Sequence, residues 1–358
     1  MRLLALAFAS ALMLSPAFAQ APPLATSEGE YVIKDFRFRS GETLPELRMH
    51  YTTLGTPHRN AAGHVDNAVL VMHGTGGDAR TFMRPIFAGV LFTPGGLLDA
   101  SKYFIILPDG LGHGKSSKPS DGLHRKFPHY DYDDMVAADY EMLTKGLKVD
   151  HLRLAMGTSM GCMHAFVMGE TWPDFADALM PLACLPTEIA GRNRIWRKLL
   201  IDGIEQDPAY LDGEYKTQPK AGLRTAESLL LIAGGAPIAM QDVYGSREKV
   251  DAYAQTYVET NLKTVDANDL IYQVAASRNY NPSARLEAIK APVMWVNSAD
   301  DFINPPELGL TSGFAKRLKK GTFVLIPASK DTHGHGTHTW AAIWKDHLAK
   351  LLKDSAPK

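Results

Sequence analysis

The segment LAMGTSMGCMH, residues 154–164, places a serine between two glycines at the end of an apolar run. A serine can act as a nucleophile when it occupies a sharp turn from a strand into a helix, which exposes its hydroxyl above the sheet. Side chains two residues before and after it would collide with the crossing strand and helix, which accounts for Gly157 and Gly161. Ser159 is therefore a candidate nucleophile. The alternative is an ordinary turn serine, because this short pattern also arises by chance.

A serine hydroxyl is a weak nucleophile without a base, and in sites of this kind an acid and then a histidine follow the serine along the chain. Asp300 and Asp301 follow the apolar run VMWVNS, and His335 follows the run TFVLIPAS. The carboxyl ends of parallel strands meet at one edge of a sheet, so these segments should converge on Ser159. We expect His335 to relay the serine proton, and either Asp301 or Asp300 to orient the imidazole.

Acyl chemistry also needs hydrogen-bond donors for the negative charge that develops on the carbonyl oxygen. The segment MHGTGGD has the H-G-x-x-G form, whose loop presents a backbone N–H toward the nucleophile. We assign the two donors of this oxyanion hole to the backbone N–H groups of Thr75 and Met160. His73 begins the pattern and is interpreted as a residue that fixes the loop, because a base is already available.

The histidines of the segment HGHGTH allow a second interpretation. His333, His335 and His338 carry imidazoles, which suit zinc, copper or nickel. A catalytic metal site commonly adds a carboxylate or a fourth histidine at workable spacing, and the serine chemistry already requires one of the three. We therefore predict acyl chemistry that uses neither a metal nor another cofactor.

The elements that must position these residues predict an α/β fold. Two alternating runs, 30–40 and 47–55, are typical of an antiparallel hairpin, and six continuous apolar runs are typical of strands buried on both faces. Helical segments alternate with the later runs, which indicates a mostly parallel sheet with helices on both faces. The six continuous runs span residues 67–74, 103–110, 152–159, 178–184, 292–300 and 322–329.

The pattern changes between residues 186 and 290, where apolar residues recur at helical spacing and no convincing strand occurs. We interpret this segment as a helical cap inserted into a core formed by residues 29–185 and 291–358. Its run LLLIAGGAPIAM is consistent with an apolar acyl pocket or with simple packing between cap helices. Helices are expected at residues 191–204, 222–235, 247–265 and 268–280.

Composition limits the partners. The 38 Lys and Arg residues against 39 Asp and Glu leave a net charge of -1, which provides no field of one sign to attract nucleic acid or an acidic membrane surface. A small-molecule acyl ester is the expected partner. The oligomeric state stays open, a homodimer included.

The first twenty residues, MRLLALAFASALMLSPAFAQ, resemble an export signal. Arg2 precedes an apolar run at residues 3–14, and Ala17-Phe18-Ala19 fits a signal peptidase site before Gln20. The run is too short to cross a bilayer, and no later segment offers the roughly 20 apolar residues that a span requires. We expect a signal peptide at residues 1–19 and a periplasmic or secreted protein.

Two cysteines remain in the mature chain, and both lie in apolar surroundings. Free cysteines are common in protein cores, which favours unpaired Cys162 and Cys184. A disulfide is the alternative, because a sequence does not supply the Cα separation that a bridge requires.

With these residues placed, the chain resembles the homoserine O-acetyltransferase family of the α/β-hydrolase superfamily. The resemblance implies Ser159 as nucleophile, Asp301 as acid because a proline follows it at the family's spacing, and His335 as base because it follows Gly334. It rests on segments that occur in family order over nearly the whole mature chain: NAVLVMHGTGGD, YFIILPDGLGHGKSS, FPHYDYDDMV, GTSMGCMHAF, DPAYLDGEYKTQPKAGLRTAE, VDANDLIYQVAASRNY, SADDFINPP and GHGTH.

The chain departs from that family at the position expected to recognise an amino-acid carboxylate. Where the transferases have an arginine after GLAIA, this chain has Glu227 after GLRTA, and Gly336 replaces the aspartate of the family's GHD. Glu227 would repel a carboxylate, and Arg224, one helical turn earlier, is the candidate replacement for the lost charge.

We therefore predict an exported serine hydrolase that cleaves acyl esters through an acyl-enzyme intermediate. The alternative is an acyltransferase of the homoserine O-acetyltransferase type, which shares the catalytic residues and differs in whether an alcohol outcompetes water. A non-catalytic binding protein would share the fold alone.

Overall fold

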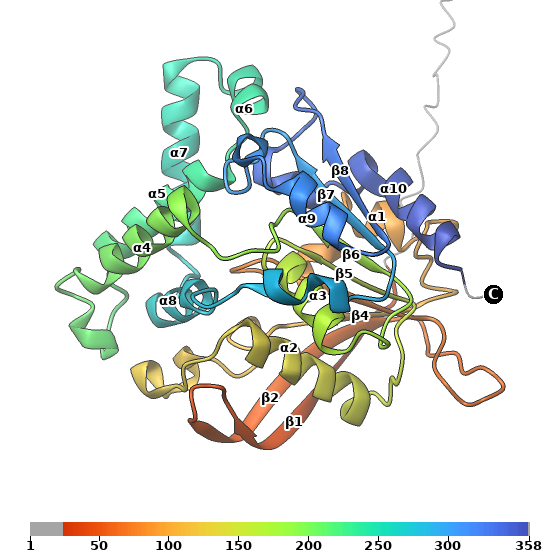
Figure 1. The fold of residues 1–358 in the computed structure, drawn as a ribbon. Helices are drawn as coiled ribbons and strands as arrows, with labels where there is room; N and C mark the ends of the chain where they lie inside the picture. Colours follow the sequence, from red (N-terminus) through yellow and green to blue (C-terminus); the bar gives the residue numbers. More distant parts are fainter. Residues whose placement is uncertain (1–23, 357–358) are drawn as a thin grey trace, which may run out of the picture.

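The structure is a computed structural model that describes residues 24–356, so the predicted signal peptide at 1–19 lies outside the described residues. One eight-stranded sheet runs through the molecule in the order β1-β2-β4-β3-β5-β6-β7-β8 (Figure 1). The eight strands are β1 (Ser27–Arg37), β2 (Thr43–Leu54), β3 (Ala68–Met72), β4 (Phe104–Pro108), β5 (Leu154–Thr158), β6 (Leu179–Leu182), β7 (Val293–Ser298) and β8 (Gly321–Ile326).

The sheet is antiparallel at one edge and parallel elsewhere. Strands β1 and β2 form the expected antiparallel hairpin, and β2 also pairs antiparallel with β4. All pairs from β4 through β8 are parallel. The predicted eight-stranded, mostly parallel sheet is thereby confirmed.

Helices cover both faces of the sheet, as the continuous apolar strands require. On β3, Leu70 and Met72 pack into a cluster with α2 (Tyr132–Glu141) and α3 (Met160–Thr171). The alternate residues Val69 and Val71 face the other side, where they pack with α1 (Ala88–Leu91) and α10 (Ala341–Asp354). Because successive side chains of a strand point to opposite faces, a run that is apolar at every position supplies both clusters.

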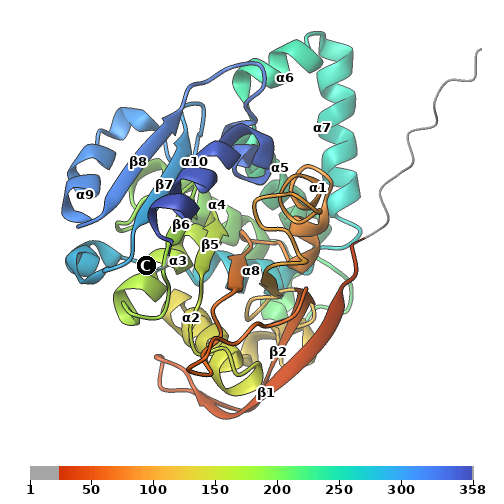
Figure 2. The same cartoon turned by 90° about the vertical axis from the view of Figure 1, so that its right-hand side faces the viewer.

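The chain leaves the sheet after β6 and returns at β7, and helices occupy most of the intervening residues. In Figure 1, α4 to α7 lie to one side of the sheet, and α7 extends well beyond it. Figure 2 shows α7 from a second direction, standing at the edge of the molecule with α6 at its end. The helices are α4 (Gly191–Glu205), α5 (Lys220–Gly234), α6 (Pro237–Val243), α7 (Arg247–Asn261) and α8 (Ala267–Ala275).

Helix α6 was not expected from the sequence. It begins at Pro237, in the first helical turn, where a missing N–H costs no hydrogen bond. The apolar run that contains it continues from α5 through Gly234 and Gly235, so periodicity alone does not separate the two helices. None of the helices within residues 24–356 has the length and apolarity needed to cross a bilayer.

The expectation of two free cysteines is wrong for this structure. Cys162 on α3 and Cys184 after β6 form a disulfide, with their Cα atoms 5.9 Å apart. Strand β6 lies beside β5, which leads into α3, so the sheet brings together two cysteines that are 22 residues apart in sequence. The bridge therefore ties the helix after Ser159 to the point where the chain leaves the sheet.

Candidate active site

Ser159 lies at the turn between β5 and α3, as the sequence predicts. Its backbone has φ 54° and ψ -108°, a strained conformation for a residue with a side chain. A Cβ atom added at Gly157 would lie 2.2 Å from the Gly161 carbonyl oxygen, and one added at Gly161 would lie 2.0 Å from the Met72 carbonyl oxygen. Only glycine fits at both positions, and the turn leaves Ser159 partly exposed.

His335 connects Ser159 to Asp301. The Ser159 hydroxyl donates to His335 Nε2 over 2.7 Å, and the opposite ring nitrogen, Nδ1, donates to Asp301 Oδ2 over 2.9 Å. His335 lies in the short helical segment η8 (Gly334–Thr339), between β8 and α10. The three side chains come from three different strand ends, so the parallel sheet brings together residues that are far apart in sequence.

Asp301 is held as a carboxylate although it is buried. The backbone N–H groups of Ile303 and Asn304 donate to Oδ1 over 2.8 and 3.1 Å, and the Asn304 side-chain amide donates to Oδ2 over 3.0 Å. Burial raises the pKa of Asp301, but the charge of His335 and these hydrogen bonds outweigh it and lower the pKa below its ordinary value. The carboxylate is thus available to orient the imidazole and to stabilise its protonated form.

The neighbouring carboxylate, Asp300, has different partners. Its Oδ2 accepts from the Thr332 hydroxyl over 2.7 Å and from the Gly334 backbone N–H over 3.1 Å, and its Oδ1 accepts from the Ser298 hydroxyl. Asp300 therefore fastens the loop that precedes His335. Of the two candidate acids, only Asp301 contacts the histidine.

The two predicted oxyanion donors lie next to Ser159. Met160 follows Ser159 directly and opens α3, and the first N–H groups of a helix have no partner within the helix. Thr75 follows Gly74, and a Cβ atom added at Gly74 would lie 3.2 Å from that of Ser159. Within residues 24–356, neither the Thr75 nor the Met160 backbone N–H donates a hydrogen bond. Both N–H groups are therefore free to bind an oxyanion.

His73 fixes the loop that carries Thr75. Its Nδ1 donates to the Gly74 carbonyl oxygen over 2.8 Å, and its Nε2 accepts from the Gly110 backbone N–H over 2.9 Å. Burial lowers the pKa of His73, which favours the neutral ring that this arrangement needs. The His73 carbonyl also accepts from the Gly161 N–H over 3.0 Å, which joins the loop to the start of α3.

The other two histidines of the HGHGTH segment do not converge with His335 on a common point. His333 stacks on Trp340, with ring centroids 3.8 Å apart. His338 is half-buried and lies edge-on to His335, and desolvation lowers its pKa to about 3. Within residues 24–356, no group of three His, Cys, Asp or Glu side chains has an arrangement that could hold a metal ion.

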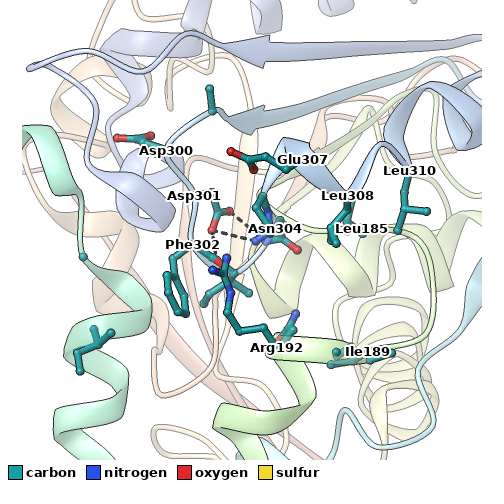
Figure 3. A pocket seen from close by; sticks show the side chains of 18 of the residues that line it. Leu185, Ile189, Arg192, Asp300, Asp301, Phe302, Asn304, Glu307, Leu308 and Leu310 are labelled. Atoms are coloured by element: carbon teal, nitrogen blue, oxygen red, sulfur yellow. Dashed lines mark hydrogen bonds between the residues drawn. The ribbon is translucent and has the colours of Figure 1, made fainter.

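A cavity of about 1060 Å³ lies between the helical insertion and the segment after β7. Figure 3 shows Asp301 at its wall, hydrogen-bonded to Asn304, with Arg192 beside Phe302. Neither Ser159 nor His335 borders the cavity, which thus adjoins the site on the side of the acid. Its other walls are mostly apolar and include five residues of the LLLIAGGAPIAM segment: Leu231, Ile232, Gly235, Pro237 and Met240.

The structure does not bring the two predicted substrate-binding residues of the insertion to this cavity. Glu227 is 5% exposed and accepts from the Asn261 side-chain amide over 2.8 Å. Burial raises the pKa of Glu227, and the hydrogen bond from Asn261 opposes that shift. Arg224 is exposed and pairs with Glu259 over 2.6 Å, so its charge is directed toward α7.

Sequence reasoning missed three side chains close to the site. Asn304 supports Asp301 and also donates to the Ala183 carbonyl oxygen over 3.1 Å; its place three residues after the acid was an available signal. Tyr132 is buried beside Thr75, and Arg197 is buried on the inner face of α4. Arg197 is a charged residue within an apolar stripe formed by Trp196, Leu200 and Ile204, and that pattern is visible in the sequence.

A family model described as the α/β hydrolase fold matches residues 67–330. The sequence is 29% identical to a probable acyltransferase from Methanothermobacter thermautotrophicus, over 83% of this chain and 89% of that protein. It is 27% identical to a homoserine O-acetyltransferase from Pelobacter propionicus, over 89% of this chain and 94% of that protein. These matches confirm the resemblance found in the sequence segments.

Solved structures show the same fold. The acetyl esterase MekB superposes with a TM-score of 0.79 at 23% sequence identity. The superposition covers 92% of this chain and 97% of the MekB chain. A homoserine O-acetyltransferase from Bacillus anthracis also gives a TM-score of 0.79, at 19% sequence identity. That superposition covers 93% of this chain and 98% of the transferase chain. Hydrolysing and transferring enzymes thus share this architecture, so the fold does not distinguish between the two activities.

Proposed function

Because the chain belongs to the α/β hydrolase fold family, we propose that it is an acyl-transfer enzyme in which Ser159 carries the acyl group of an ester substrate. The observation that supports this most strongly is the bridge made by His335, which contacts Ser159 Oγ and Asp301 Oδ2 through its two ring nitrogens. In this proposal, the N–H groups of Thr75 and Met160 form the oxyanion hole.

The chemistry proceeds in two halves. Ser159 Oγ bonds to the carbonyl carbon of the ester while His335 Nε2 takes the hydroxyl proton, and the carbonyl oxygen becomes an oxyanion. When the oxyanion collapses, the bond to the alkoxy group breaks and His335 gives its proton to the departing alcohol. The acyl-serine is then attacked by water or by a second alcohol, whose proton His335 takes and returns to Ser159.

The acceptor in the second half decides between hydrolysis and transfer. The names of the relatives favour an alcohol acceptor, because two proteins that match most of this chain are named as acyltransferases. Homoserine itself is a poor candidate for a site at Glu227, because that carboxylate is buried, is partnered by Asn261 and would repel a second carboxylate. We propose ester cleavage as the basal activity, with acyl transfer to an alcohol acceptor, which the names of the relatives favour, as the alternative.

Product analysis tests this proposal. The mature protein is incubated with p-nitrophenyl acetate or acetyl-CoA, with and without millimolar homoserine, and free acetate and O-acetylhomoserine are quantified. We expect acetate to dominate in every mixture and the Ser159→Ala variant to form neither product. A dominant yield of O-acetylhomoserine would overturn the hydrolase proposal, and Ser159-independent turnover would overturn the mechanism.

We also propose that the protein works outside the cytoplasm. The export-like first twenty residues support this, and so does the Cys162–Cys184 disulfide, since disulfides persist in oxidising compartments. Mass spectrometry of the periplasmic or secreted protein should find an N-terminus at Gln20 or within two residues of it. An intact Met1 on active cytoplasmic protein would contradict export.

A further inference from the structure

Arg197 is a buried cation whose charge has no carboxylate partner. It lies on α4 and is 3% exposed. A guanidinium carries five N–H donors. Within residues 24–356, two donors of Arg197 have protein acceptors: Nε donates to Asn193 Oδ1 over 3.0 Å, and Nη1 donates to the Ser277 hydroxyl over 3.2 Å. No carboxylate among those residues lies within ion-pair distance of it. The two hydrogen bonds and the Trp196 ring, whose centroid lies 4.6 Å from Cζ, compensate for only part of the lost hydration, and a buried charge without a counter-charge is costly.

A second unpartnered group lies beside this guanidinium. Tyr132 is 1% exposed, and its hydroxyl makes no hydrogen bond of good geometry within the described part of the chain. The side chains of Arg197, Thr75 and Ser277 surround that hydroxyl. Burial raises the pKa of Tyr132 more than the charge of Arg197 lowers it, so the phenol stays neutral and remains a donor. Two buried donor groups thus lie side by side, and within residues 24–356 no carboxylate partners either of them.

These groups lie close to the nucleophile. Tyr132 neighbours Thr75, and Thr75 follows Gly74, where an added Cβ atom would lie 3.2 Å from that of Ser159. On the other side, Asn193 accepts from Arg197 and lines the cavity of about 1060 Å³ that adjoins Asp301. The donors therefore lie between the loop that borders Ser159 and a residue that lines the cavity.

We propose that Arg197 and Tyr132 form an anion subsite that binds a carboxylate group of the substrate. A guanidinium presents its donors as a planar fork that matches the two oxygens of a carboxylate, and the phenol supplies a further donor. The bound carboxylate removes the uncompensated charge and gives the Tyr132 hydroxyl its acceptor. This proposal rests on the proposed function and deepens it, because it narrows the substrates to esters or acceptors that carry a carboxylate.

A matched pair of esters tests the subsite. Acetoxybenzoates with the carboxylate at position 3 or 4 are compared with their neutral methyl esters, and the ratio of kcat/KM for anion over neutral ester is measured. Using the ratio cancels effects of a variant on acyl transfer itself. We expect Arg197→Gln to lower this ratio by on the order of 100-fold, and Arg197→Lys by less, because it keeps the charge without the fork.

Two further variants control for folding and for net charge. Tyr132→Phe removes a hydroxyl that bonds no protein atom, so the fold should persist while the ratio falls by about tenfold. Lys198→Gln removes one positive charge from the outer surface of α4, where Lys198 pairs with Asp202, and should leave the ratio unchanged. A ratio that falls equally in Lys198→Gln would show a general charge effect and overturn the subsite.

A binding measurement reports on the subsite without turnover. In the Ser159→Ala background, millimolar benzoate should raise the melting temperature, benzamide should not, and adding Arg197→Gln should abolish the difference. If Ser159-dependent ester cleavage occurs but Arg197→Gln changes neither the ratio nor the benzoate effect, the subsite is refuted and the proposed function stands. If wild-type protein cleaves neither type of ester, the proposed function fails, and the benzoate measurement alone decides the subsite.

Discussion

The loops at the strand ends and the helical insertion hold their charged side chains in different ways. In the loops, Asp301 accepts three hydrogen bonds besides the contact with His335, and Asp300 accepts three. In the insertion, Glu227 accepts one hydrogen bond and Arg197 has no carboxylate partner within residues 24–356. The two carboxylates of the loops are fully hydrogen-bonded without a ligand, whereas the insertion retains a buried cation that a ligand could neutralise.

This difference separates reactivity from recognition. The loops are fixed by the parallel sheet, which places Ser159, His335 and Asp301 at one edge whatever substrate binds. Substrate choice is expected from the insertion, because it holds a buried cation without a carboxylate partner within residues 24–356. Changes of Ser159, His335 or Asp301 should therefore lower activity on every ester, and changes in the insertion should alter selectivity or stability instead.

The largest effect is expected for Ser159→Ala. Removal of a nucleophile of this type lowers kcat by on the order of 10⁴- to 10⁶-fold. The residual activity comes from the oxyanion hole and from substrate binding. Ester cleavage is measured on p-nitrophenyl acetate, and circular dichroism checks that the fold is kept. Activity near that of the wild type in a folded variant would show that the strand-end loops are not the reacting centre.

The two adjacent carboxylates provide a matched comparison within the loops. Asp301→Asn should lower kcat by about 10⁴-fold, because the amide favours the wrong tautomer of His335 and gives its protonated ring no charge partner. Asp300→Asn should cost about tenfold or less, because Asp300 fastens the loop before His335 and does not touch the ring. The two variants are compared under the same conditions on the same ester. A larger loss for Asp300→Asn would transfer the role of the acid to that residue.

The sequence predicts the loops better than the insertion, and the reason is physical. Strand runs are short and mostly apolar, so the ends of β5, β7 and β8 can be located to within a few residues, and parallel pairing then brings the following loops together. Helical periodicity shows which residues of the insertion share a face, but not which helix that face meets. Arg224 illustrates this limit, since it pairs with Glu259 on α7 and does not replace a lost substrate contact.

The disulfide shows the same limit within the core. The buried position of both cysteines is readable from the sequence, but their proximity follows from the pairing of β5 with β6, and the order of neighbouring strands is not visible in the runs themselves. The direct contact between His335 and Asp301, rather than Asp300, likewise depends on the turn after β7. The residues alone leave both Asp300 and Asp301 open as the acid. The family resemblance favours Asp301 through the spacing of the proline that follows it.

The Cys162–Cys184 bridge tests how firmly the two regions are joined. Replacing both cysteines by Ala should lower the free energy of unfolding by about 3 kcal/mol, the value expected for a loop of this size when a crosslink restricts the unfolded chain. Urea titrations of the variant, of wild-type protein and of wild-type protein under a reductant give the comparison. The reduced wild type should behave as the variant does. Equal stability of all three would show that the junction between sheet and insertion does not depend on the bridge.

The smallest effect is expected for Glu227→Gln, which probes a buried charge of the insertion away from the reacting centre. Burial raises the folded-state pKa of Glu227 above its unfolded value, so the stability that the protonated form provides is lost as the pH rises through that folded pKa. Gln does not titrate and can still accept from Asn261, so the variant should match the wild type near pH 4 and be more stable by about 0.5–1 kcal/mol at pH 8. Urea titrations at both pH values measure this difference in stability, and kcat/KM of the variant on p-nitrophenyl acetate should stay within about threefold of the wild-type value.

Glu259→Gln is the control of opposite sign, because the hydrogen bond and charge of Arg224 lower the pKa of Glu259, and the carboxylate there stabilises the fold as the pH rises. If Glu227→Gln is less stable than wild type at pH 8, or if it loses ester cleavage, the carboxylate is required where it lies and the insertion takes part in the reaction itself.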